Sequence, residues 1–149
     1  MVDLGCAYTV TVAGDGIGVL RMTEGWAALE WKDRESLVPA GAICRTRPSV
    51  GPGTPYFEDA SEALKRAVDA FDFEGGGAAS VEVILREGRV RDTLTLWHLL
   101  SRVDAEQRAQ VYDRTAALVP PPASVSRERV LALDDEALRL WREEMAWKW

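Results

Sequence analysis

The stretch "RTRPSVGPGTPYF", from Arg45 to Phe57, joins two halves of a 149-residue chain that follow different patterns. Before it, apolar and polar residues alternate, which is typical of β-strands. After it, apolar residues recur every three or four positions, which is typical of α-helices. The prolines of the stretch stand where a strand must stop, and its glycines stand where the chain must turn. The stretch therefore predicts a joint between a β part and a helical part.

On the N-terminal side of the joint, "AYTVTV" from Ala7 places Tyr8, Val10 and Val12 on one face and threonines on the other. This is the period of a half-buried strand. The segment "GDGIG", at 14–18, leads into a strand and lacks the spacing of a phosphate-binding loop, so it predicts a hairpin turn. Further turn signals separate more short alternating segments, at 24–25, 32–34 and 39–41. We therefore predict four to six short antiparallel strands in a meander with free edges.

On the C-terminal side, capping residues and helix stops divide the chain into short helices. Asp59 followed by Glu62 resembles a capping box in front of an apolar stripe, and predicts a helix over about 60–71. Asp92 and Asp104 are placed as caps of later helices, whereas Gly88 is placed as a stop. Further helices are predicted over about 79–87, 93–103, 105–119, 127–133 and from 135 onward.

These patterns together predict an α+β fold. A small antiparallel β-meander in the N-terminal third packs against a C-terminal bundle of short α-helices, which cover one face of the sheet. We expect a β-sheet lobe over 1–47, a Gly/Pro joint over 48–58 and a helical lobe over 59–149.

Composition narrows the class of protein. With 47% hydrophobic and 28% charged residues, the chain has the balance of a soluble globular protein. Its formal net charge of −6 repels phosphate backbones, which argues against a nucleic-acid partner. No run of about twenty apolar residues and no signal-peptide pattern occurs in the sequence, so we expect no membrane insertion by this chain.

Catalytic motifs are not found in the sequence. His98 is the single histidine, and it lies in an apolar helical stretch with no serine or cysteine at a recognisable nucleophile elbow. Adjacent acidic residues fit helix caps and solvated faces, and no spacing resembles a metal site or a glycosidase pair. The sequence therefore predicts a protein that is not an enzyme and uses no cofactor or metal.

Two groups of residues are candidates for binding. Arg45 and Arg47 share one strand face and could grip a carboxylate or phosphate, or could pair with the acidic residues of the chain itself. Trp141, Trp147 and Trp149 lie within the last nine residues, where they could pin short helices together or form a partner-facing patch.

The cysteines leave two alternatives open. Cys6 and Cys44 are the only two in the chain and have no CxxC spacing, which makes a zinc site improbable. They are either two buried thiols or one disulfide between neighbouring antiparallel strands. Their spacing alone does not decide between these.

Several segments resemble a known family. "VDLGCAYTV", "MTEGWAALEW", "PAGAICRTRPSVGPGTPYFEDA" and "TLWHLLSRVDAEQRAQVYDR" resemble, in that order, the C-terminal, extracytoplasmic part of FecR-domain proteins. The resemblance implies a non-enzymatic regulatory module that receives a signal from a protein partner in the periplasm. FecR-type proteins also carry a cytoplasmic segment that acts on a sigma factor, and a membrane helix. Neither is found in these residues, and the resemblance begins partway through the β-domain. We therefore expect the chain to be either a fragment that starts inside that domain or a short relative that has only the outer part.

The resemblance also bears on the open alternatives. In an oxidising periplasm, it implies that Cys6 and Cys44 form a disulfide. Two other functions are compatible with the sequence. One is a structural subunit that forms homo-oligomers through unpaired sheet edges. The other is a sensor of a small anion that binds at Arg45 and Arg47.

Overall fold

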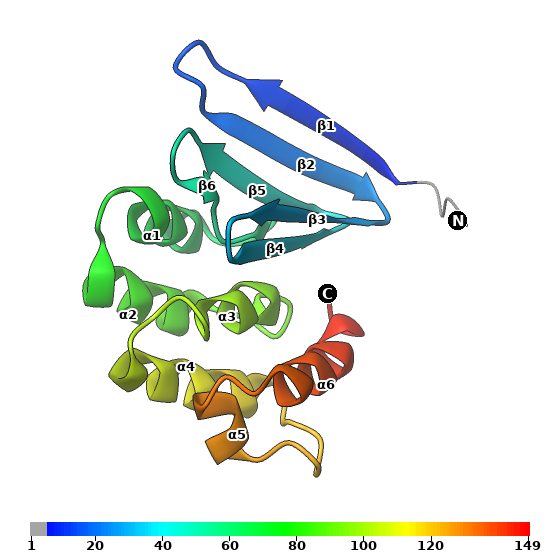
Figure 1. The fold of residues 1–149 in the computed structure, drawn as a ribbon, viewed down its shortest axis with the longest axis vertical. Coiled ribbons are helices and arrows are strands. Elements are labelled where there is room, and N and C mark those ends of the chain that lie inside the picture. The colour runs from blue at the N-terminus through cyan, green and yellow to red at the C-terminus, as the bar shows by residue number, and fades with distance from the viewer. Residues whose placement is uncertain (1–5) are drawn as a thin grey trace.

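A computed structural model describes residues 6–149 (Figure 1). The predicted α+β class is confirmed: the N-terminal part is an antiparallel β-meander, and the C-terminal part consists of helices. The helices lie together on one side of the β part, and β1 (Ala7–Val12) lies on the side away from them (Figure 1).

The meander contains two sheets. The larger sheet has the order β1-β2-β5-β6, with β7 also pairing with β5, and every pair in it is antiparallel. The hairpin of β3 and β4 forms a separate two-stranded sheet. β2 therefore pairs with β5, although the hairpin lies between them in the sequence. The remaining strands are β2 (Gly18–Glu24), β3 (Trp26–Trp31), β4 (Arg34–Pro39), β5 (Ala42–Arg47), β6 (Gly51–Pro52) and β7 (Tyr56–Phe57).

Glycine is required at two positions of the β part, one in a tight turn and one in a close contact between strands. In the β1–β2 turn, Gly16 has φ of +85°, and the Ala13 amide donates to the Ile17 carbonyl at 2.9 Å, as the glycine-rich segment predicts. Gly51 has φ of +88°, and a Cβ at this position would lie 2.5 Å from the Trp31 ring. Glycine at 51 therefore lets β3 pack directly on β6.

The smaller of two apolar clusters lies between the sheets. Leu20 and Met22 are buried on the same face of β2, whereas Arg21 and Thr23 point to the other face and are exposed. This alternation is the strand period seen in the sequence. The other buried members of the cluster are Val38, Ala42, Cys44, Phe57 and Leu94. The last of these comes from α3, so the cluster joins the sheets to the helices.

Six helices follow within the described residues: α1 (Glu62–Phe73), α2 (Gly77–Glu87), α3 (Thr93–Leu99), α4 (Ala105–Leu118), α5 (Arg127–Leu131) and α6 (Asp135–Ala146). The predicted cap at Asp104 is confirmed, because its carboxylate accepts the Gln107 amide at 2.8 Å. The predicted cap at Asp59 is wrong. Ser61 caps α1 instead and accepts the Leu64 amide at 3.1 Å.

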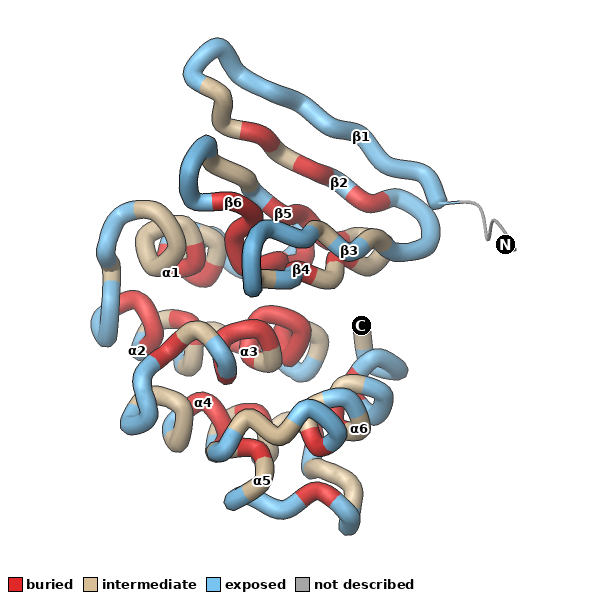
Figure 2. The backbone as a smooth tube through the Cα atoms, in the orientation of Figure 1, coloured by how far each residue is buried: buried red, intermediate tan, exposed pale blue. Residues whose placement is uncertain are grey.

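The larger apolar cluster fills the helical part. Helix α3 lies at its centre and is buried along almost its whole length (Figure 2). The β part contributes Ile43 and Tyr56 to this cluster, which seats the sheet on the helices. Trp141 is the largest fully buried side chain in the described chain, and it packs against Tyr112.

The Gly/Pro joint is bonded both to the helices and to the sheet. The Thr54 amide and hydroxyl donate to the two carboxylate oxygens of Asp72 on α1, at 2.6 and 2.9 Å. The Pro55 carbonyl accepts the Thr95 hydroxyl of α3 at 2.8 Å. Two short strands, β6 and β7, also pair parts of the joint with β5. The stretch that joins the two patterns is thus a fixed corner of the fold.

Candidate functional site

An exposed apolar face of the described chain lies on β1. Tyr8, Val10 and Val12 are 58%, 55% and 65% exposed, and no residue of this strand is buried. Opposed residues of an antiparallel pair share a face, and Tyr8 and Val10 lie opposite the buried Met22 and Leu20 of β2. The three side chains therefore extend the apolar face of the smaller cluster beyond the part that is covered. Figure 2 shows β1 exposed along its whole length.

The outer edge of β1 is also open. β1 is the terminal strand of its sheet, so within residues 6–149 it pairs with β2 alone. Sheet edges in proteins are commonly protected by charged residues, proline or bulges. "AYTVTV" contains no charge and no proline, and its pairing with β2 has a single register shift, between Ala7 and Tyr8 at the start of the strand. We call this outer edge, together with Tyr8, Val10 and Val12, the β1 surface. An extended segment that paired there would form hydrogen bonds with the unpaired backbone N–H and C=O groups of β1 and would cover the apolar side chains.

The predicted anion contacts have intramolecular partners. The Arg45 guanidinium forms an ion pair with Asp69 of α1 at 3.0 Å. Arg47 donates to the Phe73 carbonyl at 3.2 Å, and its guanidinium carbon lies 5.0 Å from the centroid of the Phe73 ring. Both arginines therefore attach β5 to α1, Arg45 through an acidic residue of the chain and Arg47 through a backbone carbonyl and a ring.

The three C-terminal tryptophans lie in different environments. Trp141 is fully buried and donates from Nε1 to the Val119 carbonyl at 3.1 Å. Trp147 is 87% exposed. Trp149 is partly buried, and its Nε1 donates to the Thr93 hydroxyl at 3.1 Å. Trp141 and Trp149 thus pin helices together, and Trp147 is the member of the three that presents most of its ring to solvent.

The predicted disulfide is not formed, since Cys6 and Cys44 are both free. The physical reason is the strand order: Cys6 precedes β1 and Cys44 lies in β5, and β2 separates these strands. Strands two positions apart in a sheet are about 9.5 Å apart, beyond the reach of a disulfide. Burial raises the pKa of the Cys44 thiol to about 12, so this thiol stays protonated at neutral pH and is a poor nucleophile.

The single histidine is a structural link between α3 and β4. His98 is buried, its Nε2 accepts the Leu37 amide at 3.0 Å, and its Nδ1 lies 2.7 Å from the Leu94 carbonyl. Because Nε2 is an acceptor here, the proton of the neutral ring is on Nδ1, which donates to Leu94. Burial, reinforced by the positive charge of Arg102, lowers the pKa of His98 to about 3. Both ring nitrogens are occupied, so the imidazole is not available as a catalytic base.

Arg102 forms a second link between the helices and the β part. Its guanidinium donates to the Thr54 hydroxyl, the Glu35 carbonyl and the Ser36 hydroxyl, each at 2.9 Å. Burial, together with the nearby charge of Arg34, lowers the pKa of Arg102 to about 10. The side chain nonetheless remains charged at neutral pH.

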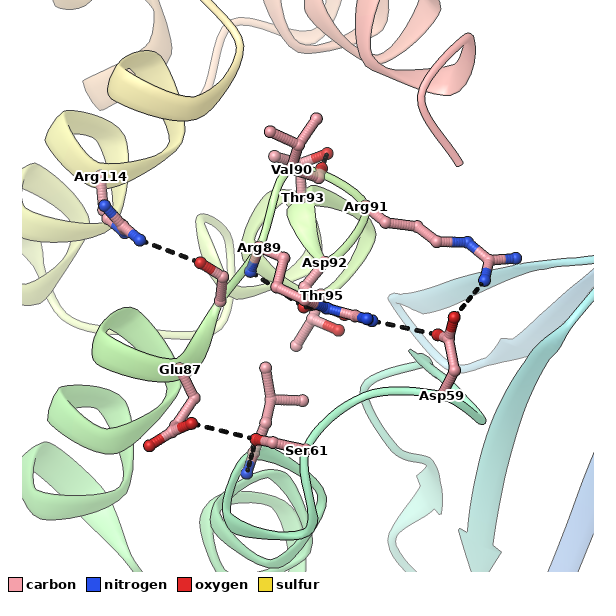
Figure 3. Close-up of polar contacts among 12 residues, drawn as sticks. Asp59, Ser61, Glu87, Arg89, Val90, Arg91, Asp92, Thr93, Thr95 and Arg114 are labelled. Atoms are coloured by element: carbon pink, nitrogen blue, oxygen red, sulfur yellow. Dashed lines mark hydrogen bonds and ion pairs between the residues drawn. The ribbon is translucent and has the colours of Figure 1, made fainter.

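A third polar network attaches the start of α1 to the start of α3 (Figure 3). Asp92 is buried and accepts the Arg89 backbone amide at 2.9 Å and its Nε at 2.8 Å. The same guanidinium reaches Asp59 at 3.0 Å, and Arg91 reaches the other Asp59 oxygen at 2.8 Å. These hydrogen bonds and charges, that from Arg89 first, hold the pKa of Asp59 below its usual value.

We expect the Asp92→Ala substitution to lower the free energy of unfolding by about 2 kcal/mol, because the lost hydrogen bonds are charge-assisted and the carboxylate is buried. The matched change Asp59→Ala removes a carboxylate that is about half exposed, and should cost less than about 1 kcal/mol. Urea denaturation of both variants measures the two costs. If both substitutions lowered the free energy of unfolding equally, Asp92 would not be the main stabilising carboxylate of this network.

Neither a metal site nor a membrane span is present in the described part of the chain. Across residues 6–149, no three side chains of His, Cys, Asp or Glu are grouped so that they could hold a metal ion. Each helix in that range is too short or too polar to cross a membrane. Comparison with known proteins adds no assignment: no family model, curated protein or solved structure matches the chain.

The β1 surface is therefore the candidate functional site. The sequence predicts that the sheet has free edges, but does not indicate which strand is terminal. The available signal is the composition of "AYTVTV", which alternates apolar residues with threonine and includes no charge. A strand of this kind is well suited to pairing on both edges.

Proposed function

We propose that this protein is a non-enzymatic protein-interaction module whose partner adds a β-strand to the outer edge of β1. The observation that carries the proposal is that β1 is a terminal, uncharged strand with an exposed apolar face. The proposed role is that of an FecR-like signal-receiving domain outside the cytoplasm. The support for the family and for the location is the resemblance of the sequence motifs.

Strand addition fits the chemistry of the β1 surface. Main-chain hydrogen bonds along the open edge would supply affinity, and the alternate side chains of the added strand would supply specificity. On one face, those side chains would lie beside Tyr8, Val10 and Val12 and complete the cover of the smaller cluster. A partner strand with apolar residues at alternate positions is the chemistry that this surface recognises.

A synthetic peptide with the sequence of β1 between terminal lysines is a suitable probe of the edge. We expect the peptide to slow amide hydrogen exchange in β1, as measured by NMR. The substitution Val10→Lys, which introduces an edge charge, should abolish this protection. The control Trp147→Lys also replaces an exposed apolar residue by lysine, but on the helical part, and should retain it. If saturating peptide left β1 exchange unchanged in the unaltered protein, the proposal would be overturned.

A second copy of this chain is the alternative partner, and the symmetry of the strand favours it. An antiparallel pairing of two β1 strands about a two-fold axis at Val10 would oppose Tyr8 to Val12 and Thr9 to Thr11. The apolar residues of both strands would then share one face and the threonines the other, with no like charges opposed. Light scattering after size-exclusion chromatography tests this alternative. A dimer that is lost in Val10→Lys and kept in Trp147→Lys would support it, and a monomer at high concentration would exclude it.

A further inference from the structure

We propose that the cavity between the β3–β4 hairpin and α6 binds a small aromatic carboxylate. The cavity has a volume of about 450 Å³, within the range of small-molecule sites. Its lining is mainly apolar and aromatic, and includes Trp26, Leu37, Pro39, Arg142, Ala146 and Trp149. This site is separate from the β1 surface, and the inference does not depend on the proposed function.

Hydrogen bonds fix two walls of the cavity. The Ala40 amide donates to the Gly25 carbonyl at 2.9 Å, which joins the residue before β3 to the residue after β4 at the open end of the hairpin. On the opposite wall, the Trp149 indole is held by its hydrogen bond to Thr93. A cavity with walls fixed in this way is formed before a ligand enters, which lowers the entropic cost of binding.

Arg142 places a positive charge on the α6 wall without a carboxylate to balance it. Within residues 6–149, its side chain makes no ion pair, and its guanidinium carbon lies 5.4 Å from the centroid of the Trp97 ring. That ring is itself fixed, because Trp97 Nε1 donates to the Leu138 carbonyl at 2.9 Å. Glu143 also lines the cavity, but its carboxylate is paired with Arg139 at 2.7 Å. The guanidinium is thus oriented, and its donors are available to a ligand.

These features select the ligand class. The two indoles that line the cavity favour a flat, apolar body, since aromatic rings pack well against each other. One guanidinium can bind one carboxylate through two parallel hydrogen bonds. A phosphate dianion would need a second positive charge, and Arg142 is the only cation among the described residues that line the cavity. An aromatic monocarboxylate matches both the lining and the charge.

The probe is 3-phenylpropionate, and its primary amide is the uncharged control of the same shape. We expect calorimetry to show the acid binding at least about tenfold more tightly than the amide, which is the effect of a charge-assisted hydrogen bond. Arg142→Gln should reduce the affinity for the acid to that for the amide. Arg86→Gln makes the same charge change on α2, outside the cavity, and should leave the preference intact.

The comparison of acid with amide uses the unaltered protein, so it remains decisive even if Arg142→Gln impairs folding. Equal affinities for the two compounds, no binding of either, or an acid preference that survives in Arg142→Gln would each overturn the proposal. Val10→Lys should bind the acid normally, because β1 does not line this cavity. Failure of the peptide experiment at β1 and failure at this cavity are therefore distinguishable.

Discussion

Replacement of Trp141 by alanine is expected to lower the free energy of unfolding by about 4 kcal/mol. The side chain has no exposed surface and is the largest fully buried one in the described chain. Its ring packs on Tyr112 with 5.1 Å between centroids, and its Nε1 bonds the Val119 carbonyl. Alanine would leave a cavity and an unsatisfied carbonyl at the centre of the helical part. A loss of this size is a large fraction of the stability of an ordinary domain.

Two further variants separate the contributions of the hydrogen bond and of burial to this loss of stability. Trp141→Phe keeps most of the ring and loses the hydrogen bond, so it should cost about 1–2 kcal/mol. Trp147→Ala removes the same side chain from an exposed position, and should change stability by less than about 0.5 kcal/mol. Urea denaturation followed by circular dichroism measures all three. The packing described here would be refuted if Trp141→Ala and Trp147→Ala had the same midpoint.

Acid is expected to destabilise the protein through His98, by about 3 kcal/mol between pH 6.5 and pH 4. The pKa of the imidazole is about 3 in the folded protein, and 6.5 is its ordinary value. In that window the unfolded chain therefore binds a proton that the folded chain does not, so stability is full above pH 6.5 and falls as the pH is lowered. Protonation would place a hydrogen on Nε2, facing the Leu37 amide that now donates to it.

Asp69 and Asp72 act in the opposite direction. Burial raises the pKa of both carboxyl groups, so their protonation in the folded state favours folding as the pH falls toward 4. The His98 contribution is therefore measured as a difference in pH dependence between the unaltered protein and His98→Gln. Glutamine cannot titrate, yet it offers an acceptor to the Leu37 amide.

Direct titration of the imidazole provides an independent measurement. The chain has one histidine, so the histidine ring signals in the NMR spectrum belong to His98. We expect them to show no titration in the folded protein between pH 8 and pH 5. A midpoint near 6.5 in the folded protein would contradict the buried, neutral imidazole.

Local patterns were sufficient to predict the fold class and most helices. Gly16 and the residues around it form the expected turn, and Asp104 caps the expected helix, because each depends on contacts within a few residues. Asp59 was assigned to the wrong role by the same reasoning. Its side chain pairs with Arg89 and Arg91, about thirty residues away, and no local pattern reveals such partners.

Strand pairing was beyond the reach of the sequence pattern. Alternation identifies β2 and β5 as strands, but does not show that they pair with each other across the β3–β4 hairpin. The predicted disulfide failed for this reason, since it required β1 and β5 to be neighbours. The β1 surface depends on the same information, because a strand is exposed only when the sheet ends at it.

For the candidate binding residues too, the sequence predicts the local placement but not the distant contacts. Periodicity places Arg45 and Arg47 on one face of a strand, but only the structure shows that they bind residues of α1. Arg142, by contrast, is one of many charged residues on an amphipathic helix in the sequence. It becomes a candidate ligand contact only when the fold places it beside Trp26 and Trp97, which come from distant segments of the chain.

The links made by His98 and Arg102 have a consequence for how the molecule comes apart. If the sheets detached from the helices, the Leu37 amide would lose its acceptor and the partly buried Arg102 guanidinium would lose three partners at once. Partial opening at the Gly/Pro corner would therefore leave several polar groups uncompensated. We therefore expect the two halves of the sequence to unfold as one cooperative unit, with no boundary of stability at the joint between their patterns.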